Sequence, residues 1–266
     1  MDLTSPRTIR NIQEQFGFTF KKGLGQNFLT ARNILEEIVD AAEIESGVIE
    51  VGPGFGVLTS ELAQNSDKVV TIEIDERLID VLDYTLAEYD NVKIINEDIL
   101  KLDLKKVIDD EFNGEKVSIA ANLPYYITTP IITKLLEEKL PIKNIVVMVQ
   151  KEVAERMSAK PSTKDYGAIT VLCQYYTEPS IVANVPASLF VPPPKVDSAV
   201  LKLKVLDKPS VEVKDEGVFF RVVKAAFSQR RKTLLNCLSA NFPIPKDEIS
   251  TLLESIGIAP SRRGET

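Results

Sequence analysis

The chain has 266 residues, of which 44% are hydrophobic and 27% charged, a composition typical of a globular protein with one large domain or one medium and one small domain. It contains no histidine, which excludes Ser-His-Asp and Cys-His nucleophilic sites, histidine-ligated metals and the usual general base. The formal net charge of −7 argues, by itself, against a nucleic-acid partner.

Two cysteines, Cys173 and Cys237, lie far apart in the sequence, and neither has the neighbours of a zinc site. Both are predicted to be small buried hydrophobic residues, and no metal site is expected. No signal-peptide pattern occupies residues 1–10, and no apolar run is long enough to span a bilayer. These features predict a cytoplasmic protein that has no membrane partner.

The N-terminal 32 residues are mildly basic and loosely patterned, which predicts an arm or a lid. Two glycines within residues 22–25 bracket a turn that then presents two amides and two apolar side chains: Gln26, Asn27, Phe28 and Leu29. A surface loop leading into a helix near Ala31 explains the same spacing equally well.

A short buried strand is predicted at residues 47–51, followed by a glycine-rich turn and a helix. Glycines such as Gly52 and Gly54 let the backbone approach a ligand closely. The next predicted strand, residues 69–74, carries Glu73 about 20 residues beyond the glycines, the spacing at which a carboxylate meets ribose hydroxyls in nucleotide-binding folds. A purely structural turn does not explain an acid on this apolar strand.

Further β-α units follow. A helix is predicted at 77–88, a strand at 92–95, two more strands at 117–121 and 145–149, and a helix at 151–157. Repeating units of this length predict a parallel, doubly wound α/β sheet.

Asp98 lies in an acidic turn after the third predicted strand. At the carboxyl end of that strand its side chain can accept a hydrogen bond from an adenine amino group. A cap or a solvated carboxylate is the commoner role for a single acid in a turn.

The sequence Asn122-Leu123-Pro124-Tyr125-Tyr126 follows a buried strand and precedes a helix predicted at 129–140. An amide oxygen, a backbone carbonyl and an aromatic face together suit a planar amine: the oxygens accept from its N–H groups and the ring stacks on its plane. An ordinary strand-to-helix turn is the alternative, because Asn, Pro and Tyr are all common in turns.

Beyond a polar loop at 160–167, a helix is predicted at 168–176, and strands at 181–185 and 196–205. Between these strands Phe190 precedes three prolines, which form a stiff support on which its ring can serve as a second aromatic wall. Alternatively, the prolines end the growth of the sheet.

Residues 208–217 are polar and predict a linker to a small C-terminal all-α domain at 208–266. Residues 218–246 contain no acid, and an apolar helical stripe there is accompanied by basic residues: Arg221, Lys224, Arg230, Arg231 and Lys232. Basic residues beside a core face are usually solvated. Because a local patch determines binding to phosphate, the absence of acids favours an RNA backbone site.

With these motifs the chain resembles the small-subunit ribosomal RNA adenine dimethyltransferases, within the class I S-adenosylmethionine-dependent methyltransferases. The resemblance covers nearly the whole chain, and its most specific motifs are residues 24–29, 50–54, 122–126, 190–198 and 227–232. Members of the family usually continue beyond a segment like residues 261–266 into a further helix, so the small helical domain is expected to be incomplete.

The resemblance implies a Rossmann-like methyltransferase domain with an N-terminal arm at residues 1–207, followed by an RNA-binding helical domain. It implies S-adenosylmethionine as cofactor and the following residues around it: Gln26, Asn27, Leu29, Gly52, Gly54, Glu73, Asp98 and Asn122. The target amine would be held by Asn122 and the Leu123 carbonyl, and the base would lie between Tyr125 and Phe190.

The implied activity is N6-dimethylation of two adjacent adenosines near the 3′ end of small-subunit ribosomal RNA, by a monomer acting on a pre-30S particle, with a role in subunit biogenesis. Other planar amines remain as alternatives: a large-subunit adenine, a DNA base or a protein glutamine. A nucleotide-binding oxidoreductase explains the glycine turn and Glu73 but gives no role to residues 122–126. A non-catalytic ribosome-assembly factor is the fourth alternative, and the intact Asn122 motif argues against it.

Overall fold

The computed structural model describes residues 1–18 and 27–266, and these divide into two compact units. The first unit comprises residues 1–154 and 178–205, and the second comprises residues 155–177 and 206–266. The second unit therefore includes a segment that the sequence placed in the sheet domain. The reason is aromatic packing: the ring of Tyr175 stacks on that of Phe219 at a centroid distance of 5.1 Å.

The first unit contains a seven-stranded sheet with the order β4-β3-β2-β5-β6-β9-β7. The five strands from β2 to β6 are parallel to their neighbours, and β9 is antiparallel to β6. The sheet strands are β2 Val48–Val51, β3 Val69–Glu73, β4 Val92–Asn96, β5 Val117–Asn122, β6 Ile142–Gln150, β7 Thr177–Val185 and β9 Ser198–Val205. The doubly wound α/β sheet predicted from the sequence is confirmed.

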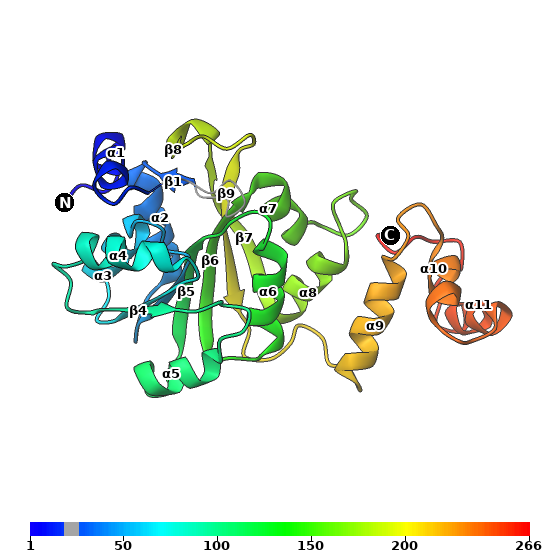
Figure 1. Ribbon diagram of the computed structural model, residues 1–266. Helices are drawn as coiled ribbons and strands as arrows, with labels where there is room; N and C mark the ends of the chain where they lie inside the picture. Colours follow the sequence, from blue (N-terminus) through cyan, green and yellow to red (C-terminus); the bar gives the residue numbers. More distant parts are fainter. Residues whose placement is uncertain (19–26) are drawn as a thin grey trace. The chain divides into compact units, whose positions relative to one another are not determined.

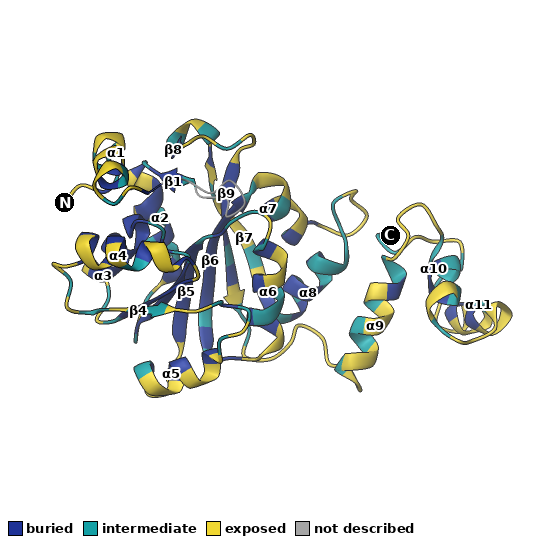
Figure 2. Ribbon diagram, in the orientation of Figure 1, coloured by how far each residue is buried: buried dark blue, intermediate teal, exposed yellow. Residues whose placement is uncertain are grey.

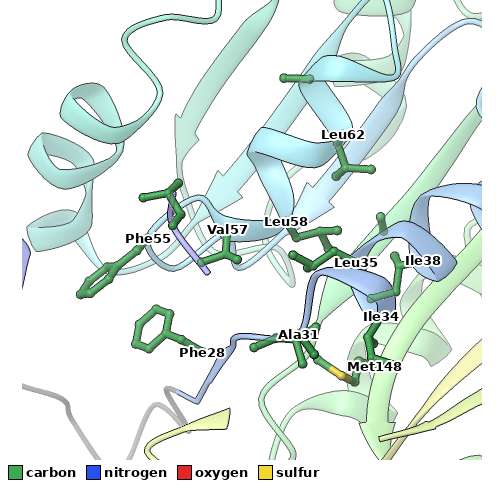
Figure 3. Close-up of a cluster of buried hydrophobic side chains, with 14 of the residues drawn as sticks. Phe28, Ala31, Ile34, Leu35, Ile38, Phe55, Val57, Leu58, Leu62 and Met148 are labelled. Atoms are coloured by element: carbon green, nitrogen blue, oxygen red, sulfur yellow. The ribbon is translucent and has the colours of Figure 1, made fainter. Parts of the chain in front are cut away.

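Helices cover both faces of this sheet. On one face lie α2 Arg32–Ala42, α3 Val57–Gln64 and α4 Ile79–Thr85, whose buried residues join those of the strands in one cluster. Figure 3 shows side chains from α2 and α3, together with Met148 of β6, in this cluster of buried hydrophobic residues. The other face carries α6 Thr128–Glu137, which lies across the strands from these helices in Figure 1, and α5 Leu104–Phe112 belongs to the same set of crossovers. Figure 2 shows β5 and β6 buried over almost their whole length.

Two short segments far apart in the sequence form a second, two-stranded sheet. Strand β1, Phe28–Leu29, pairs antiparallel with β8, Phe190–Val191. The pairing extends to Thr30, whose backbone N–H and side-chain hydroxyl both donate to the carbonyl of Leu189, at 2.9 and 2.8 Å. Before this sheet the chain forms α1, Pro6–Gln15, and the 3-10 helix η3, Ala187–Leu189, precedes β8.

Several predicted boundaries differ from the structure. The predicted helix at 77–88 begins as a 3-10 turn, η2 Glu76–Leu78, because the Asp75 carboxylate accepts from the Arg77 N–H and forms a cap there. The helices predicted at 151–157 and 168–176 are present as α7, Lys151–Met157, and α8, Ala168–Tyr176.

The second unit contains α8 and three further helices, α9 Glu216–Ala226, α10 Leu234–Asn241 and α11 Lys246–Ser255. A small core of Ala225, Leu238, Ile249 and Leu253 joins α9, α10 and α11. The apolar helical stripe predicted within residues 218–246 does not lie on one helix, since α9 ends at Ala226 and Thr233 caps α10 by accepting from the N–H of Asn236. Arg230, Arg231 and Lys232 consequently lie in a turn between two helices.

Cys173 and Cys237 are both free and buried. Among the described residues, no helix combines the length and apolar character needed to cross a membrane.

Candidate active site

A cavity opens at the carboxyl ends of the parallel strands of the first unit. Its walls come from the arm, from the turns after β2 and β4, and from the ends of β3 and β5. The sequence-predicted residues that line it are Asn27, Leu29, Gly52, Gly54, Glu73, Asp98 and Asn122. Seven residues from five segments therefore meet in one place, which is the place expected for a ligand in an open α/β sheet. Gln26 lies outside the described residues.

The glycine turn is shaped by left-handed backbone conformations. Gly52 has φ +70° and donates its N–H to the carbonyl of Ile72 at 2.9 Å, and Gly54 has φ +59°. A Cβ atom on Gly54 would lie 2.7 Å from Cε1 of Phe28, whereas one on Gly52 would have no neighbour within 4 Å. The Phe28 ring also stacks on Phe55 at a centroid distance of 4.3 Å. The absence of a side chain at Gly54 therefore lets the arm close over the turn.

Glu73 ends β3 and is 5% exposed. Its Oε1 accepts the N–H of Asp75 at 2.8 Å, and the neighbouring strand is held by Asn96 Nδ2, which donates to the Glu73 carbonyl at 2.7 Å. Burial raises the pKa of this carboxyl to about 7, although backbone N–H donors lower it. A buried carboxyl with remaining acceptor positions on a cavity wall fits a ligand that offers hydroxyl donors.

Asp98 lines the cavity and also stabilises its own turn. Its Oδ1 accepts the N–H of Leu100 at 3.0 Å, and Lys101 Nζ lies 3.8 Å from Oδ2. The two roles weighed from the sequence are therefore compatible, because the capping bond uses one of the two carboxylate oxygens.

Asn122 is the last residue of β5 and connects the sheet to the arm. Its Nδ2 donates to the carbonyl of Asn27 at 3.0 Å. No described residue donates to its Oδ1. The following residue, Leu123, is 2% exposed and its N–H donates to the carbonyl of Met148 at 3.2 Å. The arm thus fixes the amide with its acceptor oxygen available to a ligand.

Neither of the two aromatic walls predicted for the base lines the cavity. The Tyr125 hydroxyl makes a 2.7 Å hydrogen bond with Ser198 Oγ, and burial raises its pKa. Phe190 is 3% exposed and belongs to the core cluster beside β1. Tyr126, which is 58% exposed, does line the cavity.

Glu50 is a further lining residue that the sequence analysis did not select. It lies on β2 directly before the glycine turn and is 1% exposed. The signal was present, because the reasoning that selected Glu73, an acid on an otherwise apolar strand, applies equally to Glu50.

The predicted RNA-binding residues are all in the second unit. Each of the five is exposed: Arg221 and Lys224 on α9, and Arg230, Arg231 and Lys232 in the turn before α10. Arg230 Nη2 donates to the carbonyl of Lys164, so its side chain also ties that turn to the loop after α7.

The described part of the chain contains no group of three His, Cys, Asp or Glu side chains that could hold a metal ion. The carboxylates of the cavity are instead spread over separate strand ends.

The chain is similar to known proteins over most or all of its length. The sequence profile of the ribosomal RNA adenine dimethylase family matches residues 17–261. Proteins named ribosomal RNA small subunit methyltransferase A, from Bacillus mycoides and Bacillus cereus, are 55% identical over 271 aligned positions, covering all of this chain and 93% of each relative.

Two solved structures are similar over 90% of this chain. A dimethyladenosine transferase from Plasmodium falciparum is 30% identical with a TM-score of 0.70, and the match covers 92% of that chain. The 23S rRNA methyltransferase ErmE is 28% identical with a TM-score of 0.67, and the match covers 93% of that chain. With its Rossmann-like sheet, its glycine turn and its Asn122 motif, the chain belongs to the ribosomal RNA adenine dimethylase family.

Proposed function

We propose that this protein dimethylates N6 of two adjacent adenosines near the 3′ end of small-subunit ribosomal RNA, with S-adenosylmethionine as methyl donor. The family and the names of the 55% identical relatives support a ribosomal RNA of the small subunit. The observation that carries the chemistry is the meeting, in one cavity, of the Glu73 carboxyl and the Asn122 amide oriented by Asn27. We also propose that the protein is a cytoplasmic monomer and that it acts on a pre-30S particle.

The cavity fits the cofactor at both of its ends. Glu73 would accept from the ribose hydroxyls and Asp98 from the adenine amino group, since both carboxyls line the cavity. Asn27, Leu29, Gly52 and Gly54 would surround the methionine part, and Gln26 stays a prediction. When bound, S-adenosylmethionine supplies an electrophilic methyl group.

The adenine N6 is a weak nucleophile because its lone pair is delocalised into the ring. Asn122 Oδ1 and the Leu123 carbonyl would accept its two N–H groups, which favours a pyramidal nitrogen with a localised lone pair. This positioning needs no strong base, because the proton can leave after transfer, and it suits a protein without histidine.

The base must leave its stack to reach this edge of the sheet. Tyr125 and Phe190 are the proposed walls around it. A stacking role for Phe190 requires its ring to become accessible when RNA binds, because the ring is 3% exposed. Tyr126 is a third aromatic residue at this edge and is already exposed to solvent.

A transfer experiment tests the proposed function. The protein would be incubated with radiolabelled S-adenosylmethionine and small ribosomal subunits that lack the modification, with large subunits as the competing substrate. We expect label only in the small subunit, at dimethyladenosine after nuclease digestion and chromatography. Label in the large subunit would indicate that the substrate is 23S rRNA, as the name of ErmE states for that enzyme. Label in neither subunit would overturn the proposal.

A further inference from the structure

Glu50 is a buried acid to which the proposed chemistry gives no role. It lies on β2, next to the glycine turn, and is one of the residues that line the cavity. Only 1% of the residue is exposed. A carboxyl group in this position can meet a ligand in the cavity but has almost no access to water.

The protein groups around Glu50 are hydroxyls and one further acid. Thr59 Oγ1, on α3, donates to Glu50 Oε2 at 2.5 Å. Thr71 lies in register with Glu50 on β3, and its buried hydroxyl lies close enough to lower the pKa of Glu50, although it makes no hydrogen bond of good geometry with a described residue. Glu73, on the same strand as Thr71, is the nearby charged group, and its charge disfavours ionisation of Glu50.

No described element packed against Glu50 provides a cation. On α3 the acid Glu61 pairs with Arg32 at 3.3 Å, so the Arg32 charge is directed to that acid. The charged residues of α2 lie at exposed or half-exposed positions, and β5 has no charged residue. Burial of an unpaired carboxylate is costly, and a carboxyl in such a place binds a proton instead.

The pKa of each acid agrees with this geometry. Burial raises the pKa of Glu50 to about 8, with Thr59 acting in the opposite direction and Glu73 adding to the rise. Glu73 is raised by burial to a pKa of about 7. Near neutral pH the ligand-free cavity therefore holds Glu50 mainly as a neutral acid.

We propose that Glu50 loses its proton when a cation-bearing ligand enters the cavity, so that cofactor binding is coupled to the release of one proton. The O–H bond of the carboxyl breaks, the proton passes to the solvent, and the ligand's positive charge replaces it beside the carboxylate. This inference rests on the proposed function, because S-adenosylmethionine carries both an ammonium and a sulfonium charge. S-adenosylhomocysteine, which lacks the sulfonium charge, is the matched ligand.

Titration calorimetry at pH 7 in buffers of different ionisation enthalpy measures the protons released on binding. For the wild type we expect release of close to one proton or more per S-adenosylmethionine, and less with S-adenosylhomocysteine. Glu50→Gln keeps the shape of the side chain. We expect ligand binding to this variant to release nearly one proton fewer than binding to the wild type. Glu61→Gln, which removes a buried acid outside the cavity, should release as many as the wild type.

The pH dependence of affinity gives a second readout. Wild-type affinity should rise by up to about tenfold per pH unit below the Glu50 pKa, because one proton is exchanged for the ligand. Glu50→Gln should show a shallower slope, and its thermal unfolding in the absence of ligand would verify that it is folded.

Equal proton release by the wild type and Glu50→Gln would overturn the inference while leaving the proposed function intact. Equal release for S-adenosylmethionine and S-adenosylhomocysteine would support the inference and would assign the displaced proton to the ammonium, which both ligands carry. A wild type that does not bind S-adenosylmethionine would overturn the proposed function, and the inference with it.

Discussion

Glu73 presents a buried carboxyl group that accepts backbone N–H donors and lines the cavity. We expect Glu73→Gln to weaken the binding of S-adenosylmethionine by tenfold or more, because each hydrogen bond from a ribose hydroxyl to a carboxylate contributes about 1.5–3 kcal/mol. Calorimetry measures this directly. Glu76→Gln, an exposed position three residues along the chain, should bind like the wild type, and an unchanged dissociation constant for Glu73→Gln would remove the acid from the cofactor site.

In the proposed mechanism, Asn122 acts on the substrate amine rather than on the core. We expect Asn122→Ala to lower the methylation rate by about 10²–10³, the usual effect of removing one positioned hydrogen-bond partner in a transition state. The measurement is single-turnover transfer of labelled methyl to small subunits.

The melting temperature of Asn122→Ala should stay near that of the wild type, because the side chain makes one hydrogen bond, to the arm. Transfer at a near-native rate would mean that another group accepts the amine.

The raised pKa of Glu50 makes the stability of the ligand-free protein depend on pH. The folded state holds this proton up to about pH 8, whereas the unfolded chain loses it near the usual value of 4.5. The stabilisation is therefore complete below about pH 4.5 and is lost as the pH rises to about 8, at up to roughly 1.4 kcal/mol per pH unit.

Glu50→Gln has no proton to lose at this position, so it should gain stability relative to the wild type across that window. Urea unfolding at several pH values tests this prediction, and a difference that does not vary with pH would contradict it.

Among the elements, the glycine turn and β1 form a connected unit. Both Gly52 and Gly54 have positive φ, so alanine at either position costs about 1–2 kcal/mol of backbone strain. Only at Gly54 does the new methyl group meet the Phe28 ring, which adds about 1–3 kcal/mol of overpacking. We expect Gly54→Ala to lower the thermal unfolding midpoint more than Gly52→Ala does. Equal midpoints would show that the arm moves away at no cost.

The elements that the sequence predicted correctly are those with local signals. Apolar runs and glycines defined β2 and β3, and the acid at the end of β3 marked Glu73. The pairing of β1 with β8 could not be predicted, because two residues on each side carry no periodicity and their partners are about 160 positions apart. The burial of Phe190 follows from that pairing, so it could not be predicted from the sequence either.

Other differences had readable causes. The break between α9 and α10 was marked by Thr233, a good N-cap residue, but the apolar spacing on either side continued and suggested one helix. Helix α5 was not predicted, although Leu104, Val107, Ile108 and Phe112 have helical spacing. The exposure of Tyr126 depends on packing around the cavity, which the sequence does not contain.

At the scale of the whole molecule, the basic residues and the cavity belong to different units. Reversing Arg231 and Lys232 to Glu should therefore weaken binding to small ribosomal subunits and leave the affinity for S-adenosylmethionine unchanged. Each phosphate contact removed should also lower the slope of log affinity against log salt by roughly 1. Filter binding at several salt concentrations provides both quantities.

The control is the same charge change in the other unit, at Lys105 and Lys106. These exposed lysines form ion pairs with Asp109 and Asp110 one helical turn away, and such surface pairs contribute little to stability. If this variant weakened RNA binding as much as the Arg231 and Lys232 reversal, net charge rather than the turn before α10 would explain the effect.

Every described residue that lines the cavity lies between Asn27 and Met148, whereas the helices after residue 206 supply none of them. Natural selection can therefore act on the two parts separately. If the later helices recognise RNA and the cavity holds the methyl donor, as proposed, substitutions in those helices can redirect the enzyme to another RNA without a compensating change in the cavity. Substitutions in the cavity would then be selected against whatever RNA is recognised, so the two parts should accumulate substitutions at different rates as lineages diverge.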